Sequence, residues 1–144
     1  MRSTPPVDDR LDERQGGRNL EEPMSHVVPA GRHTVTPRIV VEDAAALVAF
    51  LKRVFDATGE FQSDAPSQIL IGDSLLMVSK AGPRETFPAF LYVYVEDAEA
   101  TCERALDAGA LSLEAVWETP YGDHRGMVRD PWGNVWQIAT PGRR

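Results

Sequence analysis

One loop of the sequence, residues 121–125 (YGDHR), contains the residue types best suited to proton transfer. A histidine can gain or lose a proton near neutral pH, so His124 is the candidate for a catalytic acid or base. The alternative is a loop histidine that pairs with Asp123 and has no chemical role. The sequence contains no serine–histidine–aspartate order, no phosphate-binding glycine loop and no dinucleotide fingerprint that would indicate another kind of reaction.

A second chemical feature is a strand-like run of alternating aromatic and aliphatic residues from Phe90 to Val95. Because side chains alternate between the two faces of a strand, the aromatic side chains share one face and the aliphatic ones share the other. We expect the aliphatic face to pack against helices and the aromatic face to line a cavity suited to a flat, partly apolar ligand. The alternative is that the aromatic side chains fill the hydrophobic core.

Both features belong to a chain that repeats itself. The tetrapeptide at residues 41–44 (VEDA) recurs at residues 95–98. A strand-like run, residues 36–41 or 90–95, leads into each copy, and a helical pattern follows each copy. Asp43 and Asp97 stand where a carboxylate would cap the helix N-terminus, and Gly59 and Gly109 stand where a left-handed residue would end the helix.

Short strands follow each helical pattern. In the first half, residues 67–71 and 74–79 flank Gly72-Asp73, which is a hairpin signal. In the second half the strands are residues 112–117, 126–129 and 135–140, the last two joined by a turn at residues 130–134 (DPWGN). Residues 80–88 form a linker. The element order, β-α-β-β-β twice, predicts an α+β fold.

These motifs resemble the glyoxalase/bleomycin-resistance (vicinal oxygen chelate) superfamily. The turn at residues 130–134 is similar to the Asp-Pro-x-Gly-Asn turn that closes domains of this superfamily. Residues 31–46, 71–77, 91–95 and 122–126 resemble the branch named after phosphonate-utilisation operons. The resemblance implies two βαβββ modules that form a curved mixed-sheet half-barrel around a cavity for a metal or ligand.

The resemblance also indicates which positions would hold the divalent metal ion found in superfamily enzymes. Counted from the matching motifs, these positions are Thr36, Phe90, Gln137 and, for the first half, Met77. Threonine, phenylalanine and methionine are poor or impossible ligands for a hard divalent cation, which leaves one neutral amide oxygen. We therefore expect no bound metal and no other cofactor.

The alternation of side chains and the resemblance together predict a set of ligand-binding residues. Trp136, or alternatively Trp117, would lie at the rim of the cavity. Arg38 would meet an anionic or oxygen-rich substituent of the ligand, or else pair with a carboxylate such as Glu96. The expected set is Thr36, Arg38, Met77, Phe90, Tyr92, Trp136 and Gln137.

Composition narrows the functional class. The formal net charge of −7 argues against nucleic acid or an anionic membrane as partner. No apolar run is long enough to span a membrane and the N-terminus lacks a secretory signal, so we expect a cytoplasmic protein. Cys102 is the single cysteine of the sequence, which excludes an intramolecular disulfide and a cysteine-based zinc cluster.

The polar composition of residues 1–33 predicts a flexible N-terminal extension, with Met24 as an alternative translation start. Residues 34–141 would form the glyoxalase/bleomycin-resistance-like domain, with modules at about residues 34–80 and 89–141.

The leading hypothesis is a small-molecule-binding protein, independent of metal, that holds a partly apolar or aromatic ligand in the sheet cavity. The alternative is a lyase, isomerase or dioxygenase of the same superfamily. Such an enzyme would be metal-dependent with displaced ligands, or metal-free with His124 and Gln137 as its polar groups. A third possibility is an interaction module without a cavity. The resemblance also implies a homodimer with paired half-shells.

Overall fold

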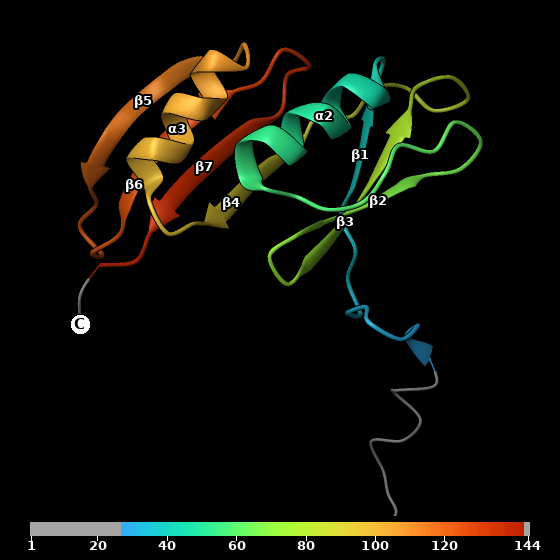
Figure 1. Ribbon diagram of the computed structural model, residues 1–144, viewed down its shortest axis with the longest axis horizontal. Helices are drawn as coiled ribbons and strands as arrows, with labels where there is room; N and C mark the ends of the chain where they lie inside the picture. The colour runs from blue at the N-terminus through green and yellow to red at the C-terminus, as the bar shows by residue number, and fades with distance from the viewer. Residues whose placement is uncertain (1–26, 143–144) are drawn as a thin grey trace, which may run out of the picture. The chain divides into compact units, whose positions relative to one another are not determined.

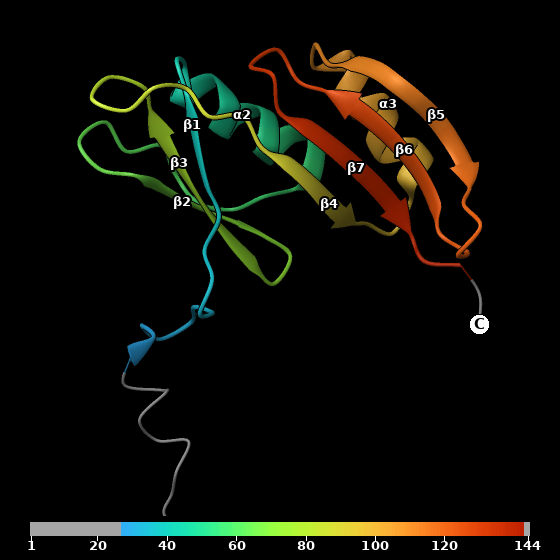
Figure 2. The same cartoon turned by 180° about the vertical axis from the view of Figure 1, so that it is seen from behind.

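The computed structural model describes residues 27–142, and the chain divides into two units, residues 1–35 and residues 36–144. Residues 1–26 of the predicted extension, together with the alternative start at Met24, lie outside the described residues. In the second unit two small sheets carry two helices on one side, while the opposite side of the sheets has no helix (Figure 1, Figure 2). No helix among residues 27–142 is long and apolar enough to cross a membrane.

The first module contains β1 (Arg38–Val41), α2 (Ala44–Phe55), β2 (Ser67–Ile71) and β3 (Ser74–Lys80). Its sheet has the order β1-β3-β2, with β1 parallel and β2 antiparallel to β3. The predicted order has three strands after the helix, but only two form, and the place of the first is taken by the isolated pair of Thr58 with Leu70. Residues 59–66 contain glycine, aspartate and proline, which pair poorly in a sheet, so the strand does not extend.

The second module has the complete predicted order. It contains β4 (Phe90–Tyr94), α3 (Ala98–Asp107), β5 (Leu111–Glu118), β6 (His124–Arg129) and β7 (Val135–Thr140). Its sheet has the order β4-β7-β6-β5, so that β4 is an edge strand, parallel to β7. The predicted α+β fold with two curved, mixed sheets is confirmed, and the half-barrel is open rather than closed.

The predicted N-caps are confirmed. The Asp43 carboxylate accepts a hydrogen bond from the Ala46 amide at 3.0 Å, and the Asp97 carboxylate accepts one from the Ala100 amide at 3.1 Å. Each bond satisfies one of the amide groups that a helix leaves without an internal partner in its first turn. The repeated tetrapeptide therefore marks the start of both helices.

Of the predicted C-caps, Gly109 is confirmed and Gly59 is wrong. Gly109 has a φ of 108° and follows α3 directly after its capping residue. The first helix ends earlier, at Asp56, whose φ of 58° is left-handed. Gly59 serves another purpose, because a Cβ atom there would clash with the backbone carbonyl oxygen of Gln68. The glycine permits close approach of the chain to β2.

The two helices and the helix-facing sides of both sheets share one hydrophobic core. The Phe55 ring of α2 packs on Trp136 of β7 with ring centroids 5.2 Å apart. The Arg104 guanidinium of α3 donates two hydrogen bonds to the Val54 carbonyl oxygen, which fastens α3 to the end of α2. The largest side chains buried in this core include Ile39, Leu47, Leu51, Ile69, Trp136 and Ile138.

The turn at residues 130–134 is held by a buried carboxylate. Asp130 Oδ1 accepts hydrogen bonds from the amides of Trp132 and Asn134 at 3.0 and 2.9 Å. Its Oδ2 accepts bonds from the Asn134 side-chain amide and the Trp136 indole, both at 2.9 Å. Asn134 Oδ1 in turn accepts a bond from the Ala89 amide at 2.8 Å. The motif on which the family resemblance depends therefore fixes the start of β4 beside β7.

Candidate functional site

The aromatic face predicted for β4 lies on the helix-free side of the second sheet. Leu91, Val93 and Val95 are partly buried and pack against the core, as the alternation predicted. On the opposite face, Phe90 is 67% exposed and Tyr94 is 60% exposed. These aromatic side chains are therefore not core residues, and the face that they form is open to a ligand.

The register of the strands places polar and aromatic side chains side by side on this face. Tyr92 of β4 lies opposite Gln137 of β7, which lies opposite Met127 of β6. Because alternate residues share a face, Arg125 of β6 lies on the same side as Tyr92. The sheet order thus brings together residues that are far apart in the sequence.

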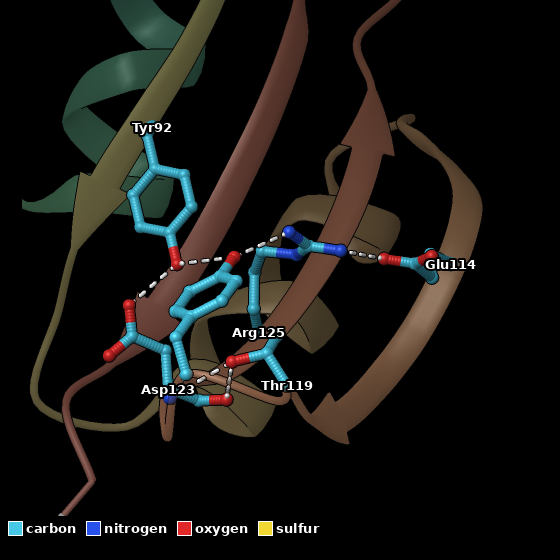
Figure 3. Close-up of polar contacts among 6 residues, drawn as sticks. Tyr92, Glu114, Thr119, Asp123 and Arg125 are labelled. Carbon is cyan, nitrogen blue, oxygen red and sulfur yellow. Dashed lines mark hydrogen bonds and ion pairs between the residues drawn. The ribbon is translucent and has the colours of Figure 1, made fainter.

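The Tyr92 hydroxyl group belongs to a hydrogen-bond network that centres on a buried carboxylate (Figure 3). Tyr92 Oη donates to Asp123 Oδ2 at 2.7 Å, and Tyr94 Oη donates to the same oxygen at 3.0 Å. Asp123 is 1% exposed. Its backbone amide and carbonyl both bind the Thr119 hydroxyl group, at 3.0 and 2.9 Å. The loop is therefore fixed, and its carboxylate orients two phenol groups.

The network continues toward β5 through a charged pair (Figure 3). One nitrogen of the Arg125 guanidinium donates to the Tyr121 hydroxyl oxygen at 2.8 Å, and another donates to the Glu114 carboxylate at 2.7 Å. The guanidinium carbon also lies 6.0 Å from the centre of the Trp117 ring. A longer contact of 3.5 Å joins the hydroxyl oxygens of Tyr121 and Tyr92. The charge of Arg125 is thus balanced by Glu114 within the network.

The electrostatics of the network shift the pKa values of three of its members, Tyr92, Glu114 and Arg125. Partial burial, together with the neighbouring Tyr121 and Asp123, raises the pKa of Tyr92 well above the ordinary value of a tyrosine. The hydrogen bond from Arg125, followed by one from Trp117, lowers the pKa of Glu114. The hydrogen bond to Glu114 raises the pKa of Arg125 in turn. At neutral pH Tyr92 therefore keeps its proton, while Glu114 and Arg125 form a charged pair.

A cavity of about 670 Å³ lies beside β4. Its walls come from the end of α2, the turn between β2 and β3, residues 91–94 of β4 with the three residues that follow, and the first turns of α3. Tyr92 and Tyr94 belong to the lining. The apolar part of the lining includes Phe55, Ile71, Leu76, Leu91 and Trp136, and the charged part consists of Asp56, Asp73, Glu96, Asp97 and Arg104.

The structure divides the predicted ligand-binding residues among three places. Phe90, Tyr92 and Gln137 share the helix-free face of the second sheet, but of these three residues only Tyr92 belongs to the cavity lining. Arg38 and Met77 are register partners in the first sheet, outside the cavity lining, and Thr36 precedes them next to Pro37, a lining residue. Trp136 is fully buried and belongs to the cavity lining, and because it alternates with Gln137 it lies on the helix side of β7.

His124 stands apart from the tyrosine network. It is exposed and begins β6, where it lies opposite Thr140 of β7 and Glu118 of β5. Since side chains alternate along a strand, His124 projects to the other face of the sheet from Arg125. The carboxylate of Asp123, its predicted partner, instead accepts hydrogen bonds from Tyr92 and Tyr94.

The sequence interpretation missed most of the network. Tyr94 follows the same alternation along the strand as Tyr92, so the sequence pattern could have identified it as a residue of the same face. Asp123 and Arg125 belong to the loop chosen for His124, but nothing in the sequence indicates which of its residues faces β4. The contact of Tyr92 with Asp123 depends on the sheet order β4-β7-β6-β5 and on the turn of residues 119–123.

The residues of this site do not fit the divalent metal ion of superfamily enzymes. Among residues 27–142, no three histidine, cysteine, aspartate or glutamate side chains are grouped as metal ligands. The positions expected to hold the ion carry Thr36, Met77, Phe90 and Gln137, of which Met77 lies in the first sheet and Phe90 and Gln137 lie in the second. A neutral hydroxyl group, a thioether, a phenyl ring and one amide do not hold a hard divalent cation.

Comparisons with known proteins agree with the fold. A protein of Mycobacterium bovis described as uncharacterized is 30% identical over 132 residues, which cover 76% of this chain and 84% of the relative. Among solved structures, TioX from Micromonospora sp. ML1 has a TM-score of 0.64 at 20% identity and covers 76% of this chain and 98% of its own.

A glyoxalase/bleomycin resistance protein/dioxygenase family enzyme from Burkholderia phytofirmans PsJN also has a TM-score of 0.64, at 23% identity, covering 74% of this chain and 96% of its own. At these identities the two solved structures show the fold and not the activity. Residues 24–138 match the family described as Glyoxalase/Bleomycin resistance protein/Dioxygenase superfamily. The chain belongs to the glyoxalase/bleomycin resistance protein/dioxygenase superfamily.

Proposed function

We propose that this protein binds a partly apolar or aromatic small molecule in the cavity beside β4, without the help of a metal ion. The observation that carries the proposal is the cavity of about 670 Å³ with Tyr92 in its wall. Ligand sites in proteins are typically concave, mainly apolar spaces of about 300–1,000 Å³ with a few well-placed polar groups. The cavity has this size and this composition.

The aromatic side chains and the ordered hydroxyl groups would divide the binding between them. A planar ligand would stack on the rings of Tyr92 and Tyr94, whose centroids lie 5.3 Å apart. Each such stacked pair contributes about 0.5–1.5 kcal/mol beyond the burial of area. The Gln137 amide, opposite Tyr92 in the register but outside the cavity lining, would orient by a hydrogen bond a part of the ligand that extends over the helix-free face.

The positions of His124 and Gln137 favour a binding protein over a metal-free lyase, isomerase or dioxygenase. Such an enzyme would use both side chains as polar groups of one site. The alternation along β6 and β7 directs His124 to the helix side of the sheet and Gln137 to the helix-free side. A general acid or base must reach the proton it moves, so the separation of these two side chains on opposite faces supports the binding proposal.

We also propose that the protein acts as a cytoplasmic homodimer of the phosphonate-operon-associated branch. Support comes from the sequence resemblance and from large apolar side chains exposed on the second sheet, among them Phe90, Leu111 and Trp117. A second copy that covers them would remove apolar surface from water. Sedimentation velocity tests this proposal: a species of one chain, 15.9 kDa, at micromolar concentration contradicts it.

The binding proposal is tested by a fluorescence-quenching screen of planar aromatic compounds, which uses the tryptophans of the protein as reporters. We expect compounds that bind in the cavity to quench the emission of Trp136, the tryptophan of the cavity lining. The control is Trp117→Phe, which removes an exposed tryptophan outside the lining and should leave the quenching in place. If no planar compound binds, the assignment of a ligand is wrong.

A further inference from the structure

The direction of the hydrogen bonds at Tyr92 determines what a ligand can offer to it. A phenol hydroxyl group has one proton to donate and two positions at which it accepts. The proton of Tyr92 is directed to Asp123 Oδ2 at 2.7 Å, a short bond to a buried carboxylate. Toward a ligand, the Tyr92 hydroxyl group therefore presents an acceptor and not a donor.

The neighbouring groups keep this direction in place. The Tyr121 oxygen accepts a hydrogen bond from Arg125 at 2.8 Å, which leaves the Tyr121 proton available for the contact with Tyr92 at 3.5 Å. Arg125 is itself engaged by Glu114, so the chain runs from Arg125 through Tyr121 and Tyr92 to Asp123. One acceptor position of Tyr92 remains for a ligand that carries a donor.

The charges of the cavity wall favour a cation. The wall contains the carboxylates of Asp56, Asp73, Glu96 and Asp97 against one basic residue, Arg104. The guanidinium of Arg104 donates to the Val54 carbonyl and to the Thr101 hydroxyl group at 3.1 Å each, so it is already engaged. A cavity lined mainly by charges of one sign concentrates ligands of the opposite sign.

Building on the proposed function, we infer that the ligand of this cavity carries a protonated amine, which donates a hydrogen bond to the Tyr92 hydroxyl oxygen. The planar part of the ligand stacks on one of the two rings, Tyr92 or Tyr94, and the cation lies against the face of the other. Aromatic rings attract cations through the negative charge of their faces, and the attraction grows as water is excluded. Ring stacking, the acceptor at Tyr92 and the acidic wall then select the same ligand, a planar amine.

Three indole compounds that differ in one terminal group test the inference on the full-length protein. Tryptamine ends in an ammonium group, tryptophol in a hydroxyl group and indole-3-acetate in a carboxylate. Titration calorimetry at neutral pH and low ionic strength measures the three affinities. We expect tryptamine to bind about tenfold more tightly than tryptophol, by adding a charge-assisted hydrogen bond and a cation over the rings, and indole-3-acetate to bind most weakly.

The outcomes separate the inference from the proposed function. If tryptophol or indole-3-acetate binds as tightly as tryptamine, the cavity is a site for aromatic compounds but the amine is not selected, and the inference is wrong. If none of the three binds, both the inference and the proposal of an aromatic ligand are overturned for this cavity. Salt screens the charges of the cavity wall. If tryptamine binds at high salt as well as at low salt, the hydrogen bond to Tyr92 contributes to the affinity in addition to these charges.

The variant Asp123→Asn tests whether the preference for tryptamine over tryptophol depends on the hydrogen-bond network of Tyr92. The asparagine side chain lacks the negative charge of Asp123, and its amide group can donate a hydrogen bond to the Tyr92 hydroxyl oxygen. That oxygen then no longer offers an acceptor position to the ligand. We expect the preference for tryptamine over tryptophol to fall from about tenfold to about twofold or less.

Glu103→Gln is the matched control, because it removes one negative charge from an exposed position of α3 outside the cavity wall. It should leave the tryptamine preference unchanged. Circular dichroism establishes that both variants fold. A folded Asp123→Asn protein with an unchanged preference would overturn the role of the network, and if that variant does not fold, the comparison of the three compounds on the natural protein decides.

Discussion

The two modules place different residues at corresponding positions of the same element order. Arg38, Val40 and Met77 of the first module correspond to Tyr92, Tyr94 and Gln137 of the second, as the strand register shows. Val40 is buried, and its carbonyl accepts a hydrogen bond from the Phe87 amide of the linker at 2.9 Å.

The outer edge of β1 is thus partly occupied by the linker, whereas residues 91–94 of β4 line the cavity. An edge strand without a neighbour exposes backbone groups and side chains that a ligand can use. Both modules therefore contribute walls and carboxylates to the cavity, and the second also contributes the tyrosine rings on which a ligand would stack.

The largest expected effect concerns the turns that connect the last two strands of each module. Asp130→Ala removes a buried carboxylate that accepts hydrogen bonds from Trp132, Asn134 and Trp136, which leaves buried donors unsatisfied. We expect the free energy of unfolding to fall by about 3 kcal/mol or more. The equivalent turn of the first module contains the exposed Asp73, and Asp73→Ala should cost less than about 0.5 kcal/mol. Urea unfolding measures both, and equal losses would contradict the comparison.

The next effect concerns the aromatic wall of β4. Tyr92→Ala should weaken the binding of a neutral planar ligand by about tenfold, because it removes both a stacking partner and buried area. Tyr92→Phe keeps the ring and should weaken that binding by less than about threefold. Titration of both variants with a compound from the quenching screen checks this. If Arg38→Ala, the corresponding change in the first module, weakens binding as much as Tyr92→Ala, the two modules do not differ in the proposed way.

A smaller effect is expected at Gln137. Gln137→Leu should reduce discrimination between ligands that differ in a hydrogen-bonding group, by about 1 kcal/mol, while the overall affinity for apolar compounds stays similar. The free energy of unfolding should change by less than about 0.5 kcal/mol, because a partly exposed amide contributes little to folding. Parallel titrations and urea unfolding separate the two quantities. A large loss of stability would show that Gln137 supports the fold and does not serve ligand binding.

The smallest effect is expected at the N-terminus. Deletion of residues 1–33 should leave the melting temperature almost unchanged, since their composition offers few side chains to bury. Differential scanning calorimetry on the shortened and the full chain gives the comparison. A fall of more than about 5 °C, which corresponds to about 1 kcal/mol for a domain of this size, would show that this segment packs on the fold.

The sequence predicted the fold from local signals. The repeated tetrapeptide located both helix starts, and the alternation in residues 90–95 correctly separated the core face of β4 from its open face. The end of α2 was misplaced, because Gly59 has a left-handed conformation for a different reason, the close approach to Gln68. Conformational freedom of a glycine can be read from a sequence, but the contact that requires it cannot.

The candidate site was less predictable, because it depends on long-range order. Tyr92 and Gln137 were identified from alternation and from the family resemblance. Asp123 was seen only as a partner for His124, since local spacing cannot show that the loop turns its carboxylate toward β4. The charged pair of Glu114 with Arg125 also joins two neighbouring strands, β5 and β6. The register between these strands is irregular between residues 112 and 117. Such shifts follow from the packing of the whole sheet.

The claim that a small aromatic molecule binds beside β4 is tested most directly by a nuclear magnetic resonance titration of the isotope-labelled protein with tryptamine. We predict that the shifted amide signals will cluster in the three segments that form the cavity wall, residues 54–56, 71–74 and 91–97. The side chain of Gln137 should shift with them. Saturable shifts confined to the outer faces of α2 and α3, or no shifts at millimolar tryptamine, would contradict this account of the site.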